Sequence, residues 1–193
     1  MVRPAAAVLL AGPTVLAFFS GGYDVEPQLL GAALAFCLLG VLIAATPWPP
    51  IRGRGLAALL ALAGLAAWTG ASIAWAPIRD TAAEEAVQLT LYAAAFAAAL
   101  VAMRDPLVRR WAAPALLAGT AIVAVYALAG RLLPDVFPFE FSSRAGSRIQ
   151  QPLTYWNALG LLMAFGVLLA ISVCSDGERS PRLRIAACAA TVP

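Results

Sequence analysis

Apolar runs of about twenty residues, separated by short polar stretches, constrain this chain more than any other feature. An α-helix rises about 1.5 Å per residue, so a run of this length crosses the ~30 Å hydrocarbon layer of a bilayer. A further run begins at Ile185 and reaches Pro193 without the length to cross. The sequence therefore predicts an all-α, polytopic transmembrane helix bundle with six complete spans plus the start of a seventh. The six predicted spans are residues 1–20, 27–46, 55–75, 86–103, 112–130 and 153–175.

Composition supports a membrane location and argues against nucleic-acid binding. Hydrophobic residues make up 62% of the chain and charged residues 12%, with a mean hydropathy of +0.85. The lipid bilayer is thus the first expected partner. The net charge of +3 comes from arginines scattered among the loops, whereas a protein that binds nucleic acid concentrates its basic residues on one face.

The distribution of arginine predicts the orientation. Cytoplasmic loops are enriched in basic residues, and a cytoplasmic N-terminus places nine arginines inside and four outside. We therefore expect a multi-pass protein of the cell (inner) membrane. Because the last apolar run is incomplete, we also expect residues 1–193 to form a single membrane domain that is the N-terminal part of a longer protein. The inner set is Arg3, Arg52, Arg54, Arg104, Arg109, Arg110, Arg179, Arg182 and Arg184, and the outer set is Arg79, Arg131, Arg144 and Arg148.

The inventory of reactive side chains is small. Cys37, Cys174 and Cys188 lie in separate apolar segments without the spacing of metal ligands, so we predict buried thiols and assign no disulfide. The chain has no histidine, which removes the commonest general base and metal ligand. We expect no metal and no cofactor.

Charged, amide and aromatic residues gather in one stretch, RIQQPLTYWNALG, from Arg148 to Gly160. Pro152 suits the first turn of a helix, which predicts a helix that begins there and continues to about Ser175. The free N–H groups of a helix N-terminus, together with Arg148, would favour an anion such as a phosphate.

The same residues also admit simpler interpretations. Arg148 would be a charge extending to the membrane surface from a helix end, and Tyr155 and Trp156 would belong to an interfacial aromatic belt. Asn157 shares a helix face with Gly160 and Ala164, which favours contact between helices.

This stretch resembles the O-antigen ligase and O-antigen polymerase family, whose members often carry an Arg and then a Pro and an Asn at the start of a membrane helix. Here those residues are Arg148, Pro152 and Asn157. A version found in high-GC bacteria reads PLGYWNALG, and this chain departs from it at Thr154. A second likeness, SIAWAPIRDTAAEEAVQLTLY over residues 72–92, is similar to a Ser-x-x-Trp-x-Pro turn and the helix after it.

The resemblance implies a glycosyltransferase that moves a glycan from a polyprenyl-diphosphate carrier, undecaprenyl diphosphate, to an acceptor glycan or lipid on the outer face of the membrane. It implies inversion without a metal, as a ligase or a polymerase. Catalytic residues are not identified and are expected beyond Pro193, so residues 1–193 alone are expected to be inactive. A transporter or flippase and a non-catalytic assembly partner remain alternatives. Residues expected to bind the diphosphate or the lipid carrier are Arg144, Arg148, Gln151, Tyr155 and Asn157.

Overall fold

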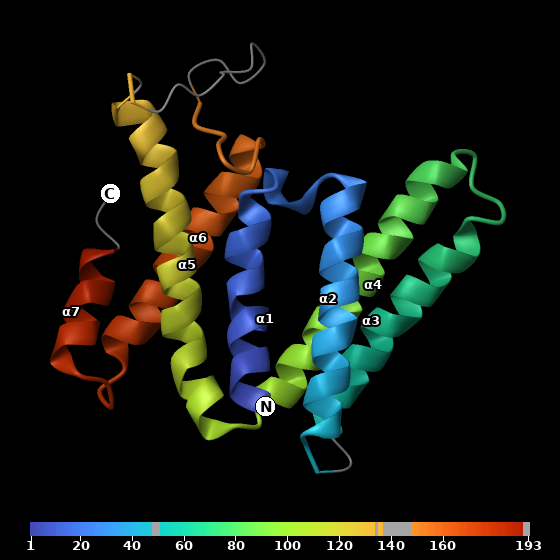
Figure 1. The fold of residues 1–193 in the computed structure, drawn as a ribbon, viewed down its shortest axis with the longest axis horizontal. Coiled ribbons are helices and arrows are strands. Elements are labelled where there is room, and N and C mark those ends of the chain that lie inside the picture. The colour runs from blue at the N-terminus through green and yellow to red at the C-terminus, as the bar shows by residue number, and fades with distance from the viewer. Residues whose placement is uncertain (48–50, 134, 137–147, 191–193) are drawn as a thin grey trace. The chain divides into compact units, whose positions relative to one another are not determined.

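A computed structural model describes residues 1–47, 51–133, 135–136 and 148–190, and over these ranges the chain is helical with no β-strand (Figure 1). Within these ranges, seven α-helices and one short 3-10 helix, η1, follow one another. This confirms the all-α class. The elements are α1 (Val2–Ala17), η1 (Ser20–Gly22), α2 (Val25–Ala44), α3 (Gly53–Ser72), α4 (Arg79–Ala102), α5 (Pro106–Leu132), α6 (Trp156–Ser175) and α7 (Pro181–Ala189).

Five helices, α2 to α6, are long and apolar enough to cross a membrane among the residues described. The sequence predicted six complete spans, and the difference lies in the first. Helix α1 has 16 residues and a length of about 24 Å, which is short of the hydrocarbon layer. It ends early because Ser20, Gly21 and Gly22 have positive φ angles, which an α-helix does not accommodate.

The helices divide into two compact units. Unit 1 consists of residues 1–9 and 24–109, and unit 2 of residues 10–23 and 110–193. Helix α1 and helix α5 each contribute to both units. We describe each unit by itself.

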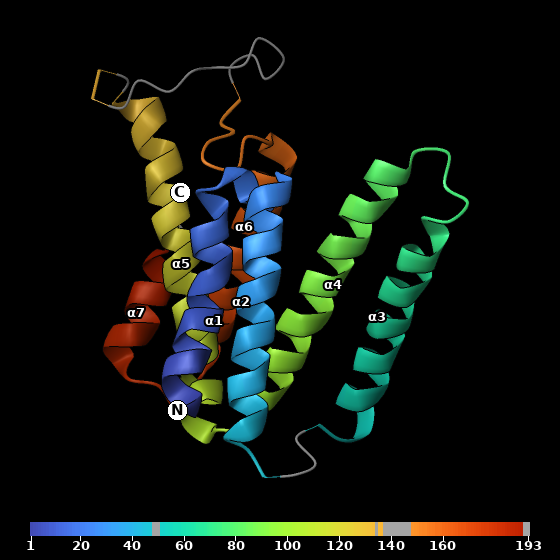
Figure 2. The same cartoon turned by 45° about the vertical axis from the view of Figure 1, so that its right-hand side comes forward.

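Unit 1 is built on alanine-rich packing between α2 and α4. Ala32 and Ala35 of α2 meet Leu91 and Ala94 of α4. A second cluster surrounds Leu42, which is fully buried among side chains from α1, α4 and α5. Helix α3 lies beside α4 (Figure 2) and has no buried residue.

Charged groups join the start of α1 to the α4–α5 turn in unit 1. Arg3 Nε lies 3.1 Å from Asp105 Oδ2. Asp105 Oδ1 accepts a hydrogen bond from the Leu107 backbone N–H at 2.8 Å, so the same carboxylate caps helix α5. This cap explains why α5 begins at Pro106, ahead of the predicted start at residue 112.

Unit 2 packs through glycine and threonine where its helices cross. A Cβ atom at Gly119 of α5 would collide with Thr14 Oγ1 of α1, and one at Gly166 of α6 would lie 3.2 Å from Thr120 Oγ1. Small residues at such crossings allow membrane helices to approach closely. Beside them, Ala17, Val123 and other residues form an apolar cluster.

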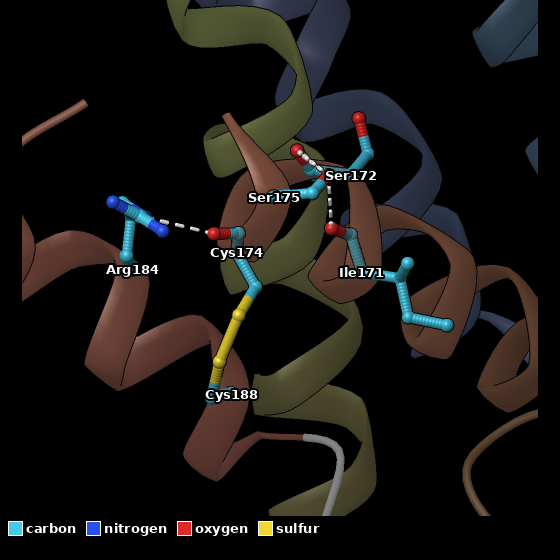
Figure 3. The surroundings of a disulfide bond; sticks show 6 residues. All are labelled: Ile171, Ser172, Cys174, Ser175, Arg184 and Cys188. Atoms are coloured by element: carbon cyan, nitrogen blue, oxygen red, sulfur yellow. Dashed lines mark hydrogen bonds between the residues drawn. A yellow bond between two sulfur atoms is a disulfide. The ribbon is translucent and has the colours of Figure 1, made fainter. Parts of the chain in front are cut away.

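A disulfide joins Cys174 of α6 to Cys188 of α7 (Figure 3), so the expectation of unpaired thiols at these positions is wrong. The two cysteines are 14 residues apart in the chain, and the turn at residues 176–180 reverses the chain and brings them together. Cys37 is a free cysteine, as predicted, but it is exposed rather than buried.

Candidate functional site

The polar stretch forms a turn and then a helix, and the helix begins later than the sequence predicted. Helix α6 begins at Trp156, four residues after Pro152. The Gln151–Pro152 peptide bond is cis, and Thr154 has a φ angle of 63°. Tyr155 is in an extended conformation. Because Thr154 and Tyr155 both leave the right-handed helical region, Pro152 cannot belong to the first turn of α6.

Apolar contacts hold the turn in place within unit 2. Leu153 is buried in the cluster that contains Ala17, Val123 and Leu159, and Ile149 packs against the same cluster. The Leu153 side chain also lies over Gly21, where an added Cβ atom would be 3.5 Å away. The turn is thus anchored by its apolar residues, which leaves its charged and aromatic residues available for other contacts.

Arg148, Tyr155 and Asn157 come together around Trp156. The Arg148 guanidinium carbon lies 5.1 Å from the centre of the Trp156 ring, within the range of a cation–π interaction. The rings of Tyr155 and Trp156 are 5.4 Å apart. Asn157 Nδ2 donates a hydrogen bond of 2.9 Å to the Tyr155 hydroxyl. An arginine, two aromatic rings and an amide therefore form one continuous group at the start of α6.

This arrangement suits an anion in two respects. A guanidinium that rests on an aromatic ring uses its face for that contact, and its N–H donors point outward in the plane of the group. Arg148 is exposed, so an anion in solution can reach these donors. The first N–H groups of α6 have no helical acceptor, and the Tyr155 side chain makes no capping hydrogen bond to them.

Gln151 is the other predicted residue that the structure describes, and it does not belong to this group. Gln151 is half-buried in the turn, and no hydrogen bond joins it to Arg148. Arg144 lies outside the described residues. The buried face of α6 carries Gly166 rather than Gly160, and an added Cβ atom at Gly160 would meet nothing within 4 Å. The predicted contact face through Asn157 and Gly160 is therefore wrong for the described residues.

Two residues near the site were not among those predicted to bind a ligand. Trp156 was interpreted as a possible member of an aromatic belt and left out of the expected binding residues, yet its ring supports the guanidinium of Arg148. The signal was an arginine close to a tryptophan across a proline turn. In a regular helix or strand, however, two residues eight positions apart are too distant to touch. Gln150 is 7% exposed, and nothing in the pattern of the sequence distinguishes it from Gln151.

The described residues contain no group of three or more His, Cys, Asp or Glu side chains arranged to hold a metal ion. Comparison with known proteins yields no match to the chain among family models, curated proteins or solved structures.

Proposed function

We propose that this chain is a membrane portion of an O-antigen ligase-like glycosyltransferase, which transfers a glycan from a polyprenyl-diphosphate carrier to an acceptor on the outer face of the cell membrane. The observation that carries the proposal is the Arg148 guanidinium seated on Trp156 at the start of α6. The substrate-binding group would consist of Arg148, Arg144, Gln151, Tyr155 and Asn157.

The backbone at Thr154 supports the resemblance on which the proposal rests. Thr154 has a left-handed φ angle of 63°, which β-branched residues rarely adopt and glycine adopts readily. The related motif PLGYWNALG has glycine at this position. A turn whose shape favours glycine, in a segment that otherwise matches that motif, agrees with a shared local structure.

An ion pair in unit 1 supports the orientation. Arg3 pairs with Asp105, so the start of α1 lies at the same end of unit 1 as the α4–α5 turn. Arg104 extends from the same turn and donates a hydrogen bond to the Pro47 carbonyl oxygen at 3.3 Å. This arginine-rich end suits the cytoplasmic side. The start of α6, preceded by one more complete span, would then face outward.

The proposed chemistry breaks the bond between the anomeric carbon of the glycan and the diphosphate oxygen of the carrier. An acceptor hydroxyl attacks the carbon from the opposite side, which inverts its configuration, and the diphosphate leaves with the bonding electrons. Arg148 would bind the carrier diphosphate and stabilise the negative charge that develops as it leaves. Tyr155 and Asn157, joined by their hydrogen bond, would present a hydroxyl and an amide beside it. The proton of the acceptor passes to a base outside this group.

Replacement of Arg148 in the full-length protein tests the proposal. Loss of one charge-assisted contact to a developing anion costs roughly 3–4 kcal/mol, so Arg148→Ala should lower the transfer rate about a hundred- to thousandfold. Arg148→Lys should restore little, because it keeps the charge but loses the planar fork. Transfer is measured in membranes supplied with a polyprenyl-diphosphate-linked glycan and an acceptor.

Arg131→Ala is the matched control, because Arg131 is an exposed arginine in the last turn of α5 and belongs to the same predicted outer set. This variant should retain normal transfer. Transfer by the two variants is compared at equal amounts of the protein in the membrane. Near-normal transfer by Arg148→Ala would show that Arg148 only anchors the start of α6, and the proposal would fail.

A further inference from the structure

The α6–α7 hairpin of unit 2 carries a covalent bond whose partners come from two different helices. Cys174 is in the last turn of α6, Cys188 is in α7, and their Cα atoms are 5.7 Å apart (Figure 3). Between them the turn is held by Asp176, whose Oδ2 lies 2.7 Å from Arg179 Nε. Asp176 Oδ1 also accepts a 3.1 Å hydrogen bond from the Glu178 backbone N–H.

Noncovalent contacts hold the same two helices in register independently of the bond. Val173 of α6 and Ala187 of α7 share one buried cluster, against which Leu183 also packs. Arg184 Nε donates a 2.8 Å hydrogen bond to the Cys174 carbonyl oxygen. Figure 3 shows this hydrogen bond beside the disulfide. These contacts would keep the two sulfur atoms close together after the bond is reduced, so it can form again.

The proposed orientation places this hairpin in a reducing compartment. Arg179, Arg182 and Arg184 all belong to the predicted cytoplasmic set. In the cytoplasm small thiols keep cysteines reduced, and the disulfides that do form there are mostly transient ones. Cys188 is exposed and Cys174 is half-buried, so a soluble thiol has access to one of the two sulfurs.

We propose that Cys174 and Cys188 form a reversible redox clasp, which joins α7 covalently to the end of α6 when oxidised and leaves only the noncovalent contacts between them when reduced. The clasp rests on the orientation given under the proposed function and is independent of glycosyl transfer. The expected reductant is a small monothiol such as glutathione, and the expected oxidant is its disulfide.

The exchange proceeds in two balanced steps. The thiolate of one monothiol attacks Cys188 Sγ, the bond between the protein sulfurs breaks, and Cys174 leaves as a thiolate that takes up a proton. The thiolate of a second monothiol then attacks the small-molecule sulfur of the mixed disulfide, and Cys188 leaves as a thiolate that takes up a proton. This releases the Cys188 thiol and the oxidised small-molecule disulfide. Two electrons and two protons reach the protein in total, and the reverse reaction closes the clasp.

Trypsin cleavage gives a direct readout, because Arg179, Arg182 and Arg184 lie between the two cysteines. The full chain, with an epitope tag at its C-terminus, is placed in inverted membrane vesicles and equilibrated with mixtures of glutathione and its disulfide. It is then blocked with a maleimide, cleaved and run on a non-reducing gel. With the clasp closed the two fragments stay joined, and with it open they separate. The joined fraction should rise as the disulfide form increases and fall again when the mixture is reversed.

Three variants sharpen this readout. Cys188→Ser should give separate fragments in every mixture, whereas Cys37→Ser should match the parent chain, because Cys37 is a free cysteine outside the hairpin. Arg184→Gln should close the clasp several-fold more slowly, since it loses the hydrogen bond that holds the helices in register. Separate fragments from the parent chain in every mixture, or joined fragments in every mixture, would overturn the proposal.

A membrane-impermeant phosphine reductant tests on which side of the membrane the clasp lies, independently of whether the clasp forms. It should open the clasp in inverted vesicles and leave it closed in intact cells grown under oxidising conditions. Opening only in intact cells would overturn the cytoplasmic placement. Arg148→Ala should leave every one of these results unchanged, so loss of transfer activity and failure of the clasp are distinguishable.

Discussion

The two units of this protein differ in the residues that form their closest described helix contacts. In unit 1 large side chains such as Leu42 and Leu91 fill the spaces beside alanines of neighbouring helices. In unit 2 helices cross where Gly119 and Gly166 leave room for threonine side chains. Lipid tails are as apolar as leucine, so burial from water contributes little to either contact. Stability in both units therefore depends on how closely the surfaces fit.

This difference determines what each unit tolerates. A contact filled by a large side chain is weakened when atoms are removed, because the remaining cavity has no partner atoms. A contact that depends on glycine is weakened when atoms are added, because the helices must separate. The proposed site and the disulfide both belong to unit 2. Close helix contacts there keep Leu153, and with it the turn that leads to Trp156, in a fixed position.

Removal of a buried side chain should cause the largest loss in unit 1. Leu42 is 0% exposed and Leu60 of α3 is 63% exposed. Leu42→Ala should lower stability by about 2–3 kcal/mol, the lower part of the range for buried leucines, because lipid replaces water as the alternative environment. Leu60→Ala is the matched control and should change stability by less than about 0.5 kcal/mol. Thermal unfolding in detergent micelles measures both, and equal losses would contradict this description of unit 1.

Addition of a single methyl group should destabilise unit 2. A Cβ atom at Gly119 would collide with Thr14 Oγ1 and lie 3.3 Å from Thr14 Cβ, so Gly119→Ala should cost about 1–2 kcal/mol. Gly64→Ala on α3 is the control, because an added Cβ atom there meets nothing within 4 Å. It should be neutral or stabilising, since alanine favours a helix. The same thermal measurement applies, and unchanged stability of Gly119→Ala would show that the α1–α5 crossing is loose.

Replacement of Thr154 by glycine tests the turn at the proposed site and should raise stability rather than lower it. Thr154→Gly should stabilise the protein by about 1 kcal/mol, because glycine adopts the left-handed conformation without a steric penalty. Thr154→Ala retains a Cβ atom and serves as the control, so it should remain less stable than the glycine variant. If glycine were no better than alanine in thermal unfolding, the backbone at residue 154 would not be left-handed.

The apolar runs of the sequence were sufficient to predict the fold class and the approximate position of each long helix. Helix ends were predicted less well, because they depend on local hydrogen bonds and turns rather than on hydrophobicity. Helix α4 begins at Arg79, ahead of the apolar run that starts at residue 86, since polar residues outside the hydrocarbon layer continue the helix. Helix α6 begins at Trp156, after Thr154. The left-handed conformation of Thr154 is not predicted by helix or strand propensities.

The candidate site shows the same limit. The sequence was enough to select the stretch from Arg148 to Asn157 as one that concentrates chemistry. It did not reveal that Trp156 would support Arg148, because that contact depends on the path of the intervening turn. The pairing of Cys174 with Cys188 was missed for the same reason. In each case residues far apart in the chain meet through irregular backbone, which periodicity does not describe.

The smallest expected effect concerns the polar end of unit 1 and is a dependence on pH. The pKa of the Asp105 carboxyl is lowered, chiefly because it accepts the hydrogen bond from the Leu107 backbone N–H, and also by the Arg3 guanidinium. A group whose pKa is lower in the folded state contributes stability above its unfolded pKa of about 4, and this contribution is lost as the pH falls through the folded value. The midpoint temperature of thermal unfolding of the parent chain should therefore decrease slightly as the pH is lowered below about 4. Asp105→Asn should show a smaller fall over the same interval, because asparagine can still cap α5 but has no charge to lose. An identical pH dependence in the parent and the variant would mean that the Arg3–Asp105 pair contributes nothing to unit 1, and that its stability rests on alanine and leucine packing alone.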